Sequence, residues 1–464
     1  MKKELLLKEI LAQNKHWNND GLGFEEQKHK RKLFSDLLKY LPERQILSIV
    51  GLRRTGKTML LKQLIGHLMN QERVHPQKIF FISFDEALVT LKLTLENYIE
   101  TYFEYLGEED GDETTYIFLD EIQYIGKWQH ILKRYYDRHP NIKFVVSGSS
   151  SLFLKKETTE SLAGRIYEFK LPPLSFEEFL ELSDENPELL MEYRKFSVPV
   201  VSAHILHTQK EYDLFLTRFG DTLTRLFEDY LLYYQFPEMV GQHDMEKIRK
   251  YIAESVYKKA LEYDIPRLFG VEKVDELKFL FQTLVHENGS LLEFQTLSSE
   301  AGIEENTLKK YLLYFQESFL VDVVYNYSKS FRKSKRLQKK AYISSTNFFT
   351  AFRSEWLENP LLKAEYFGLL VETYIFNILK ERFQYVSFLR KGREEVDFVV
   401  NNDYRNEDGR RMAEVKYVNS MEWKDIRFID KTAKRLKSMP YFVYSKKSMK
   451  IDAEKIILPC FLVR

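Results

Sequence analysis

Short apolar runs alternate with amphipathic stretches between about residues 30 and 180. The runs cover Ile46–Val50, Ile79–Phe84, Tyr116–Leu119 and Phe144–Val146. Such runs, separated by segments with helical periodicity, are typical of strands that helices connect and cover. The pattern predicts an α/β fold with a mostly parallel sheet in this part of the chain.

A helical pattern dominates from about residue 185 to 270, where aromatic residues recur at helical spacing. The segment from 275 to 345 then has the pattern of a helix, a short helix, a helix and strands. Gly302 supplies the turn before the third helix, and the positions from Val321 to Tyr325 alternate as in a strand. This order predicts a winged helix.

The last part of the chain returns to an α/β pattern. A long helical segment, Leu361–Phe383, leads into the strands Glu395–Val400 and Met412–Tyr417, and a further helix and strand follow. The predicted domains are an α/β domain with an N-terminal helix, a helical lid or connector, a winged helix and a second α/β domain, at residues 1–184, 185–272, 273–350 and 351–464.

The composition is that of a folded protein with several domains. The 464 residues are 44% hydrophobic and 30% charged, with a net charge of +1. A single cysteine, Cys460, excludes an internal disulfide, and no apolar stretch approaches the length that spans a bilayer. We therefore expect a cytoplasmic protein without membrane attachment. Because the net charge is balanced, only a local patch of charge could indicate a nucleic-acid partner.

The segment G-L-R-R-T-G-K-T matches the phosphate-binding P-loop pattern G-x-x-x-x-G-K-[ST]. It follows the predicted strand Ile46–Val50 and opens a helix, which is the setting that the motif requires. Glycines let backbone N–H groups surround phosphates, and the helix N-terminus adds a favourable dipole. We predict that ATP is bound by Gly51, Arg53, Arg54, Thr55, Gly56, Lys57 and Thr58. Lys57 would contact the β- and γ-phosphates, and Thr58 would bind Mg²⁺.

Two carboxylates follow the apolar strand Tyr116–Leu119. Asp120 and Glu121 stand at its carboxyl end, where ligands bind in open α/β sheets. We predict that Asp120 holds Mg²⁺ and that Glu121 polarises the attacking water. The next strand ends in serines, of which Ser147 and Ser149 are candidate sensors of the γ-phosphate. A serine-rich turn without this role is the alternative.

The motifs G-L-R-R-T-G-K-T, L-D-E-I-Q, V-S-G-S-S-S and L-A-G-R-I-Y-E-F-K-L-P-P-L-S-F-E-E-F follow one another in this order. The order resembles AAA-type P-loop ATPases of bacteria and archaea that carry a C-terminal domain of the DUF4143 kind. The resemblance implies that Arg165 is an arginine finger, acting within its own subunit or on a neighbour; a structural salt bridge is the alternative. Two features depart from the family pattern. Gln235 replaces a glycine, and Ser344 and Ser345 stand where an aspartate is usual.

A basic segment, Lys329–Lys340, lies in or beside the predicted wing. Seven of its twelve residues are Lys or Arg, which is enough to neutralise several phosphates with little sequence preference. A solvated loop between strands is the alternative. Beside a winged helix, we favour contact with DNA.

The segments G-R-E-E-V-D-F-V-V and M-A-E-V-K-Y-V resemble the core of PD-(D/E)xK nucleases. Alternation along a strand puts Glu414 and Lys416 on one face, and Asp397 on the neighbouring strand can meet Glu414. The resemblance implies that Asp397 and Glu414 hold Mg²⁺ while Lys416 orients the attacking water, with Glu372 as an accompanying helical acid. An acid–base pair without catalysis is the alternative, because fold does not establish activity.

Together these patterns predict an AAA-type ATPase that couples its nucleotide state to DNA or a partner through a winged helix and a nuclease-like domain. Two alternatives remain. The protein is an endonuclease that depends on Mg²⁺ and is controlled by ATP, or it is a nucleotide-gated regulatory module with negligible turnover. A protein partner or a homo-oligomer is compatible with each.

Overall fold

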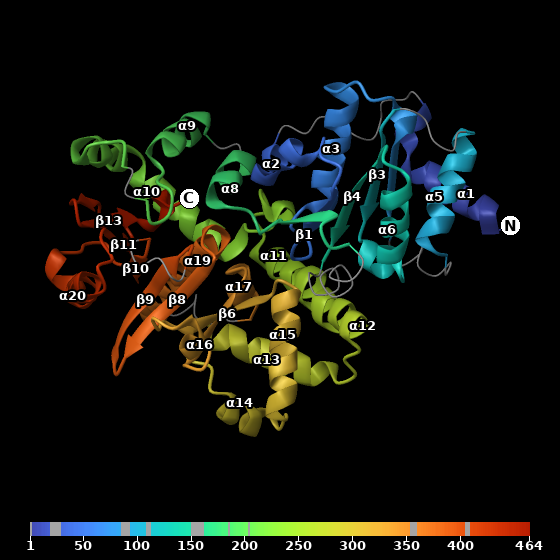
Figure 1. Ribbon diagram of the computed structural model, residues 1–464. Helices are drawn as coiled ribbons and strands as arrows, with labels where there is room; N and C mark the ends of the chain where they lie inside the picture. Colours follow the sequence, from blue (N-terminus) through green and yellow to red (C-terminus); the bar gives the residue numbers. More distant parts are fainter. Residues whose placement is uncertain are drawn as a thin grey trace. The chain divides into compact units, whose positions relative to one another are not determined.

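The computed structural model describes residues 2–18, 29–84, 93–107, 113–149, 162–183, 186–202, 205–352, 360–403 and 409–464 (Figure 1). The chain divides into two compact units. One comprises Met1–Pro172 with Glu317–Phe319, and the other comprises Pro173–Gln316 with Leu320–Arg464.

The first unit is built on a five-stranded sheet in which all neighbours are parallel, in the order β2-β3-β4-β1-β5. Its strands are β1 (Ile46–Val50), β2 (Ile79–Ser83), β3 (Thr115–Asp120), β4 (Ile142–Gly148) and β5 (Ile166–Lys170). The first four coincide with the apolar runs, which confirms the α/β prediction. The hydrophobic pattern does not reveal β5, because this strand lies at the edge of the sheet and its residues are largely exposed.

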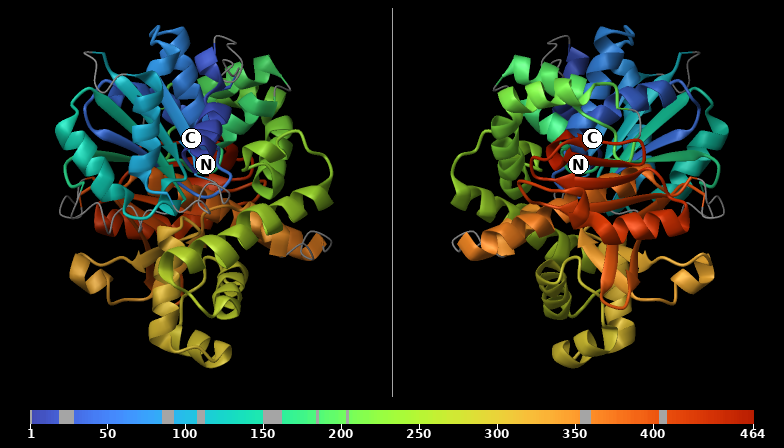
Figure 2. Two further views of the ribbon diagram at one scale, coloured as in Figure 1. Left: turned by 90° about the vertical axis from the view of Figure 1, so that its right-hand side faces the viewer. Right: turned by 90° about the vertical axis from the view of Figure 1, so that its left-hand side faces the viewer.

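Helices cover both faces of this sheet. They are α1 (Lys2–Gln13), α2 (Lys32–Tyr40), α3 (Lys57–Asn70), α5 (Leu95–Leu106) and α6 (Trp128–Arg138), with a short 3-10 turn η1 (Lys15–Asn18). α3 lies on one face, and α5 and α6 lie on the other (Figures 1 and 2). This placement follows from the strand order, because connections between parallel strands are right-handed. Leu60, Leu64 and Val145 are fully buried where α3 meets the sheet.

The second unit contains a mixed eight-stranded sheet in the order β12-β13-β11-β10-β9-β8-β6-β7. Its strands are β6 (Val321–Asn326), β7 (Lys339–Ile343), β8 (Tyr385–Lys391), β9 (Glu394–Asn401), β10 (Arg411–Lys416), β11 (Tyr441–Ser445), β12 (Lys450–Ile451) and β13 (Lys455–Pro459). β6 pairs with β8 in parallel, with Tyr325 opposite Ser387. The strands expected in the winged helix are therefore continuous with the sheet of the last region.

The helices of this unit precede the sheet or pack against it. They are α8 (Phe176–Ser183), α9 (Pro187–Phe196), α10 (Gln209–Tyr233), α11 (Met245–Tyr251), α12 (Ile265–Phe269), α13 (Val274–His286), α14 (Phe294–Ala301), α15 (Glu305–Glu317), α16 (Phe331–Ser334), α17 (Asn347–Phe352), α19 (Pro360–Arg382) and α20 (Arg427–Leu436). α19 runs along β7 to β10. α20 packs on the sheet in a buried cluster with Val396, Met412 and Tyr441.

The two departures from the family pattern meet in space at the end of α10. The side-chain oxygen of Gln235 accepts hydrogen bonds from the Ser345 hydroxyl (2.8 Å) and the Thr346 amide (2.9 Å). Asn347 and Thr350 of α17 donate to the last carbonyls of α10, those of Leu231 (3.0 Å) and Leu232 (2.7 Å). Because the final carbonyls of a helix have no partner within it, these side chains satisfy them and fix α17 to α10.

Candidate functional site

The phosphate-binding loop of the first unit runs from the end of β1 to the start of α3. Gly51 lies so close to the chain after β5 that an added Cβ would overlap the carbonyl oxygen of Leu171. Gly56 has a left-handed backbone, with φ 96° and ψ 22°, directly before the first turn of α3. The first position needs glycine for space and the second for its φ angle. The loop thus leads into the N-terminus of α3, where anions are favoured.

Lys57 and Thr55 fold back onto this loop. The Lys57 ammonium is buried and donates to the carbonyl oxygens of Gly51 (3.0 Å) and Leu52 (3.2 Å). The Thr55 hydroxyl donates to the Leu52 carbonyl at 2.9 Å. Within the described part of the chain, Lys57 pairs with no acidic residue. A cation held by neutral carbonyls can exchange them for phosphate oxygens, with which its hydrogen bonds are stronger.

One arginine supports the loop from outside, and two belong to it. Arg31, before α2, is buried and donates to the carbonyl of Thr55 and, at 2.8 Å, to that of Pro172. The sequence gives no signal for this support, because an isolated arginine has many alternative partners. Arg53 donates to the Tyr124 hydroxyl at 3.2 Å, and Arg54 has a left-handed backbone with φ 67°. Contact of Arg53 and Arg54 with ATP stays a prediction.

Asp120, at the carboxyl end of β3, is surrounded by hydroxyl groups. Oδ2 accepts hydrogen bonds from Thr58 (2.7 Å) and Ser83 (3.0 Å), and Oδ1 accepts one from Ser147. Burial raises the pKa of Asp120, and the nearby charge of Glu121 adds to this effect. Among the described residues no basic side chain forms an ion pair with Asp120. A buried carboxylate without a cationic partner, next to a threonine hydroxyl, has the donor set that Mg²⁺ prefers.

Glu121 is held by two residues from its surroundings. Its backbone is left-handed (φ 53°), and its amide donates to the Ser147 hydroxyl at 3.1 Å. Its carboxylate accepts a hydrogen bond of 2.5 Å from the Gln123 amide, which also donates to the Ser149 hydroxyl at 3.1 Å. Gln123 thereby joins the predicted water-polarising residue to a predicted sensor. The sequence contains Gln123 in the motif L-D-E-I-Q, but its spacing alone does not reveal this contact.

Arg165 lies at the amino ends of the strands, whereas the loop lies at their carboxyl ends. Its carbonyl accepts from the amide of Ile46, at the start of β1, whereas the loop follows Val50 at the end of that strand. Its guanidinium pairs with Asp137 at 2.8 Å. The length of β1 separates Arg165 from the phosphate loop, which does not favour an arginine finger acting within the same subunit. Action on a neighbouring subunit stays a prediction beside the salt bridge.

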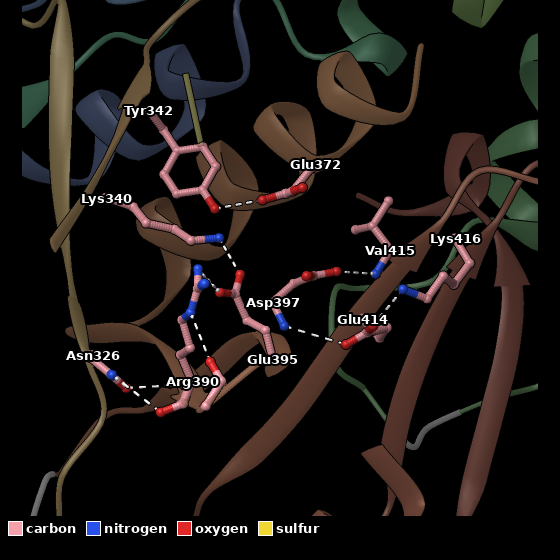
Figure 3. Close-up of polar contacts among 11 residues, drawn as sticks. Asn326, Lys340, Tyr342, Glu372, Arg390, Glu395, Asp397, Glu414, Val415 and Lys416 are labelled. Carbon is pink, nitrogen blue, oxygen red and sulfur yellow. Dashed lines mark hydrogen bonds and ion pairs between the residues drawn. The ribbon is translucent and has the colours of Figure 1, made fainter. Parts of the chain in front are cut away.

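In the second unit, Asp397 of β9 and Glu414 of β10 lie side by side (Figure 3). The Asp397 carboxylate accepts from the Val415 amide at 2.8 Å, and the Asp397 amide donates to Glu414 at 3.3 Å. Lys416 pairs with the other oxygen of Glu414 at 2.8 Å, which agrees with the predicted alternation along the strand. The sequence-predicted trio is therefore brought together.

A β-bulge lies at Asp397. Val396 pairs with Leu389 and Val399 pairs with Ser387, so that two residues of β9 face a single residue of β8. Bulges re-aim side chains and are frequent next to active sites. The irregularity depends on pairing between strands, which a single-strand pattern does not show.

Glu372 joins this cluster from α19. Its carboxylate accepts a hydrogen bond of 2.6 Å from Tyr342 (Figure 3). Burial raises the pKa of Glu372 to about 7, and repulsion from Asp397 adds to the shift. Burial likewise raises the pKa of Glu414 to about 8, against the opposing charge of Lys416. Glu395 nearby is paired with Lys340 and, at 3.5 Å, with Arg390.

These carboxylates are satisfied by protein donors rather than arranged around a common ion. Across the ranges that the structure describes, no group of three or more His, Cys, Asp or Glu residues is placed to hold a metal. Lys416 and the Asp397 amide each contact one oxygen of Glu414, so Mg²⁺ there would share this carboxylate with both donors. Metal binding and catalysis by Asp397, Glu414 and Lys416 stay predictions.

The predicted wing connects β6 to β7 and contains α16. Lys340 is buried and paired with Glu395, so this one of the seven basic residues is not available to phosphates. Lys335 stands 3.8 Å from the centre of the Tyr325 ring. Lys309 of α15 and Lys339 of β7 stand 5.6 and 5.7 Å from the ring of Phe294.

The segment after α13 is also joined to this hairpin. The amides of Gly289 and Leu292 donate to the carbonyls of Ala341 and Lys339, at 2.8 Å each. The order along the chain is thus helix, short extended segment, two helices and hairpin. None of the described helices is both long enough and apolar enough to cross a membrane.

Several uncharacterized proteins are similar to this chain in sequence. Two uncharacterized proteins of Methanocaldococcus jannaschii are 25% and 24% identical over 326 and 415 residues, covering 68% and 86% of this chain. The chain spans 66% of the first relative's own length and 79% of the second's. An uncharacterized protein of Haemophilus influenzae is 26% identical over 277 residues, 59% of this chain and 60% of that protein.

Similar solved structures include C. elegans PCH-2 and the S. cerevisiae Hsp104–casein complex. Their identities are 15% and 16%, and their TM-scores are 0.27 and 0.31. They cover 52% and 67% of this chain, and 60% and 53% of their own. At scores this low, neither informs the structure or action of this chain.

Family models match two parts of the sequence. Residues 224–353 match a "Domain of unknown function (DUF8612)", so a DUF4143 domain is not confirmed. Residues 43–180 match an "AAA domain", which spans the phosphate loop, Asp120 and Glu121. With the parallel sheet and the loop geometry, this match supports a P-loop core of the AAA type in this part of the chain.

Proposed function

We propose that this protein binds Mg²⁺–ATP at the loop Gly51–Thr58 and hydrolyses it. One observation carries the proposal: the Thr58 hydroxyl donates to Asp120 Oδ2 at 2.7 Å. The two residue types expected to bind Mg²⁺ thus already lie together beside a buried lysine. The match of residues 43–180 to an AAA domain supports the same function.

Each side chain has a role in this proposal. Bound Mg²⁺ supplies positive charge that neutralises the phosphates. Thr58 and Asp120 would hold the ion, and Lys57 would exchange the carbonyls of the loop for phosphate oxygens. Glu121, kept in place by Gln123, would accept a hydrogen bond from the attacking water.

Phosphate release and ATP binding by three proteins test this function. Wild type should release phosphate, Lys57→Ala should neither bind nor hydrolyse ATP, and Glu121→Gln should bind ATP but release phosphate about a hundredfold more slowly. Equal release by wild type and Lys57→Ala contradicts hydrolysis at this site. Tight binding without turnover in the wild type would instead favour the regulatory module.

We also propose that α15 and the wing contact DNA and that nucleotide state changes this contact. The order of helices and hairpin between α13 and β7 supports a winged helix, and the exposed Arg332, Lys333 and Arg336 supply positive charge. Contacts of this kind follow the phosphate backbone and weaken with salt. A homo-oligomer or a protein partner is compatible with this proposal.

Fluorescence anisotropy with a labelled duplex, at several salt concentrations and with or without ATP, tests the DNA contact. Replacing Arg332, Lys333 and Arg336 by Gln should weaken binding and lower the salt slope by roughly two to three. A control replaces Arg427, Lys431 and Arg435, three exposed basic residues of α20, by Gln. Equal loss in both triple variants would indicate a general charge effect and contradict the proposed face.

A second candidate function is cleavage of DNA, favoured by the convergence of Asp397, Glu414 and Lys416. Plasmid DNA incubated with Mg²⁺ or Mn²⁺ should be cut by wild type but not by Asp397→Asn or Lys416→Met. Cleavage that persists in both variants excludes this site as its source.

A further inference from the structure

The outer edge of β2 has no strand beside it in the part of the chain that the structure describes. Among the described strands β2 is terminal in the order and pairs with β3 alone. An edge strand leaves a row of backbone N–H and C=O groups, at every second residue, that need other partners. In β2 these residues are Ile79, Phe81 and Ser83, which alternate along the strand.

Side chains from the end of α1 and from η1 occupy this edge. Asn14 donates to the Phe81 carbonyl at 2.8 Å and accepts from the Phe81 amide at 2.7 Å. Gln13 accepts from the Ser83 amide at 2.8 Å and donates to the Ser83 carbonyl at 3.4 Å. Each carboxamide thus makes the pair of hydrogen bonds that a neighbouring strand would make.

The rest of the edge is covered by η1. The Trp17 indole donates to the Ile79 carbonyl at 2.8 Å, and a His16 ring nitrogen lies 3.0 Å from the same oxygen. Trp17 is buried and stacks on Tyr102 of α5, with ring centres 5.5 Å apart. The segment therefore has a fixed position against β2 and α5.

Ser83 connects this edge to the nucleotide site. Its hydroxyl donates to Asp120 Oδ2 at 3.0 Å, beside Thr58, while its backbone is held by Gln13. We propose that Ser83 is a further residue of the magnesium site and that Gln13 is its positioning residue, acting from the N-terminal segment. Asn14 makes the same type of contact with Phe81, the preceding residue of β2 that faces this edge, and the Phe81 side chain has no hydrogen bond to the site. A substitution of Asn14 therefore distinguishes a general effect on the edge from a specific effect on Ser83.

This inference rests on the proposed ATPase, and the Mg²⁺ dependence of phosphate release at saturating ATP tests it. Gln13→Leu should raise the Mg²⁺ concentration at half-maximal rate roughly threefold, and Ser83→Ala roughly tenfold, as for other residues that orient metal ligands. ATP binding in EDTA should not change. Gln13→Glu keeps the acceptor of the Ser83 amide but loses the donor to the Ser83 carbonyl, so its shift should be smaller than that of Gln13→Leu.

Asn14→Ala is the matched control. It should lower the melting temperature without moving the Mg²⁺ midpoint. The inference is overturned if Gln13→Leu has the wild-type midpoint, or if Asn14→Ala shifts the midpoint as much as Gln13→Leu does. If wild type has no turnover, the proposed hydrolysis fails by itself. The same variants are then compared by the Mg²⁺ dependence of fluorescent ATP-analogue binding, with the same criteria.

Discussion

Two buried carboxylate centres of this chain are held in opposite ways. Asp120 lies among the hydroxyls of Thr58, Ser83 and Ser147, and in the described ranges it pairs with no basic side chain. Its burial is costly without a paired positive charge. This centre therefore suits a cation from solution, delivered together with a nucleotide.

The centre in the second unit contains its own positive charge. Glu414 pairs with Lys416 at 2.8 Å, and Asp397 accepts from the Val415 amide at 2.8 Å. Glu372 is bound by Tyr342. The sequence predicts Mg²⁺ at both centres, but hydroxyl groups surround Asp120 whereas Lys416 accompanies Glu414. Residue type and spacing therefore do not determine whether a buried carboxylate needs an external ion.

The largest expected effect comes from removing the charge of Asp120. Asp120→Asn keeps the size of the side chain but not the ligand, so phosphate release should fall about a hundredfold or more. ATP binding in EDTA should persist. An unchanged rate of phosphate release in a folded Asp120→Asn variant would contradict the role of Asp120 as a ligand of Mg²⁺.

A pH titration of unfolding distinguishes the second centre. Burial raises the folded-state pKa of Glu414 to about 8 and that of Glu372 to about 7. Above the unfolded pKa near 4.5 the native state then binds more protons than the unfolded state, so stability should fall between pH 5 and 8. Glu414→Gln should reduce this loss by about 2 kcal/mol. A wild type whose unfolding free energy rises over this range would contradict the assignment.

The cap at the end of α10 should have an intermediate effect. Asn347→Ala leaves the Leu231 carbonyl without one of its donors and should cost about 1–3 kcal/mol in the unfolding free energy. Ser328→Ala, in the loop after β6, is a control expected to change stability little. Denaturant unfolding measures both, and equal stability of the two variants would contradict the role of the cap.

The smallest effect is expected for Arg165. Its pair with Asp137 is largely exposed, so Arg165→Ala should change stability by about 0–1 kcal/mol. If Arg165 acts on a neighbouring subunit, the variant should lose phosphate release only at concentrations at which wild type assembles. Loss of activity in a wild-type-like monomer would contradict our placement of this residue.

The sequence predicted the parts of the fold that depend on local pattern. β1 to β4 are buried runs, and the loop Gly51–Thr58 between β1 and α3 has residue types that its geometry requires. The elements that were not predictable depend on distant partners. β5 is exposed at an edge, and β6 joins the sheet of the last region through a parallel pairing with β8.

The same distinction applies to the candidate sites. Asp120 and Thr58 were identified because each belongs to a local motif. Gln13 and Arg31 were not, because each acts through main-chain groups far away in the sequence, a contact that many residue types can make. Likewise, the bulge at Asp397 arises from strand pairing.

The most direct test of the contrast between the two centres is phosphate release as a function of Mg²⁺ by wild type, Asp120→Asn and Asp397→Asn. We expect release by wild type that depends on Mg²⁺, negligible release by Asp120→Asn and wild-type release by Asp397→Asn. Undiminished release by Asp120→Asn, or loss of release by a folded Asp397→Asn variant, would contradict the account.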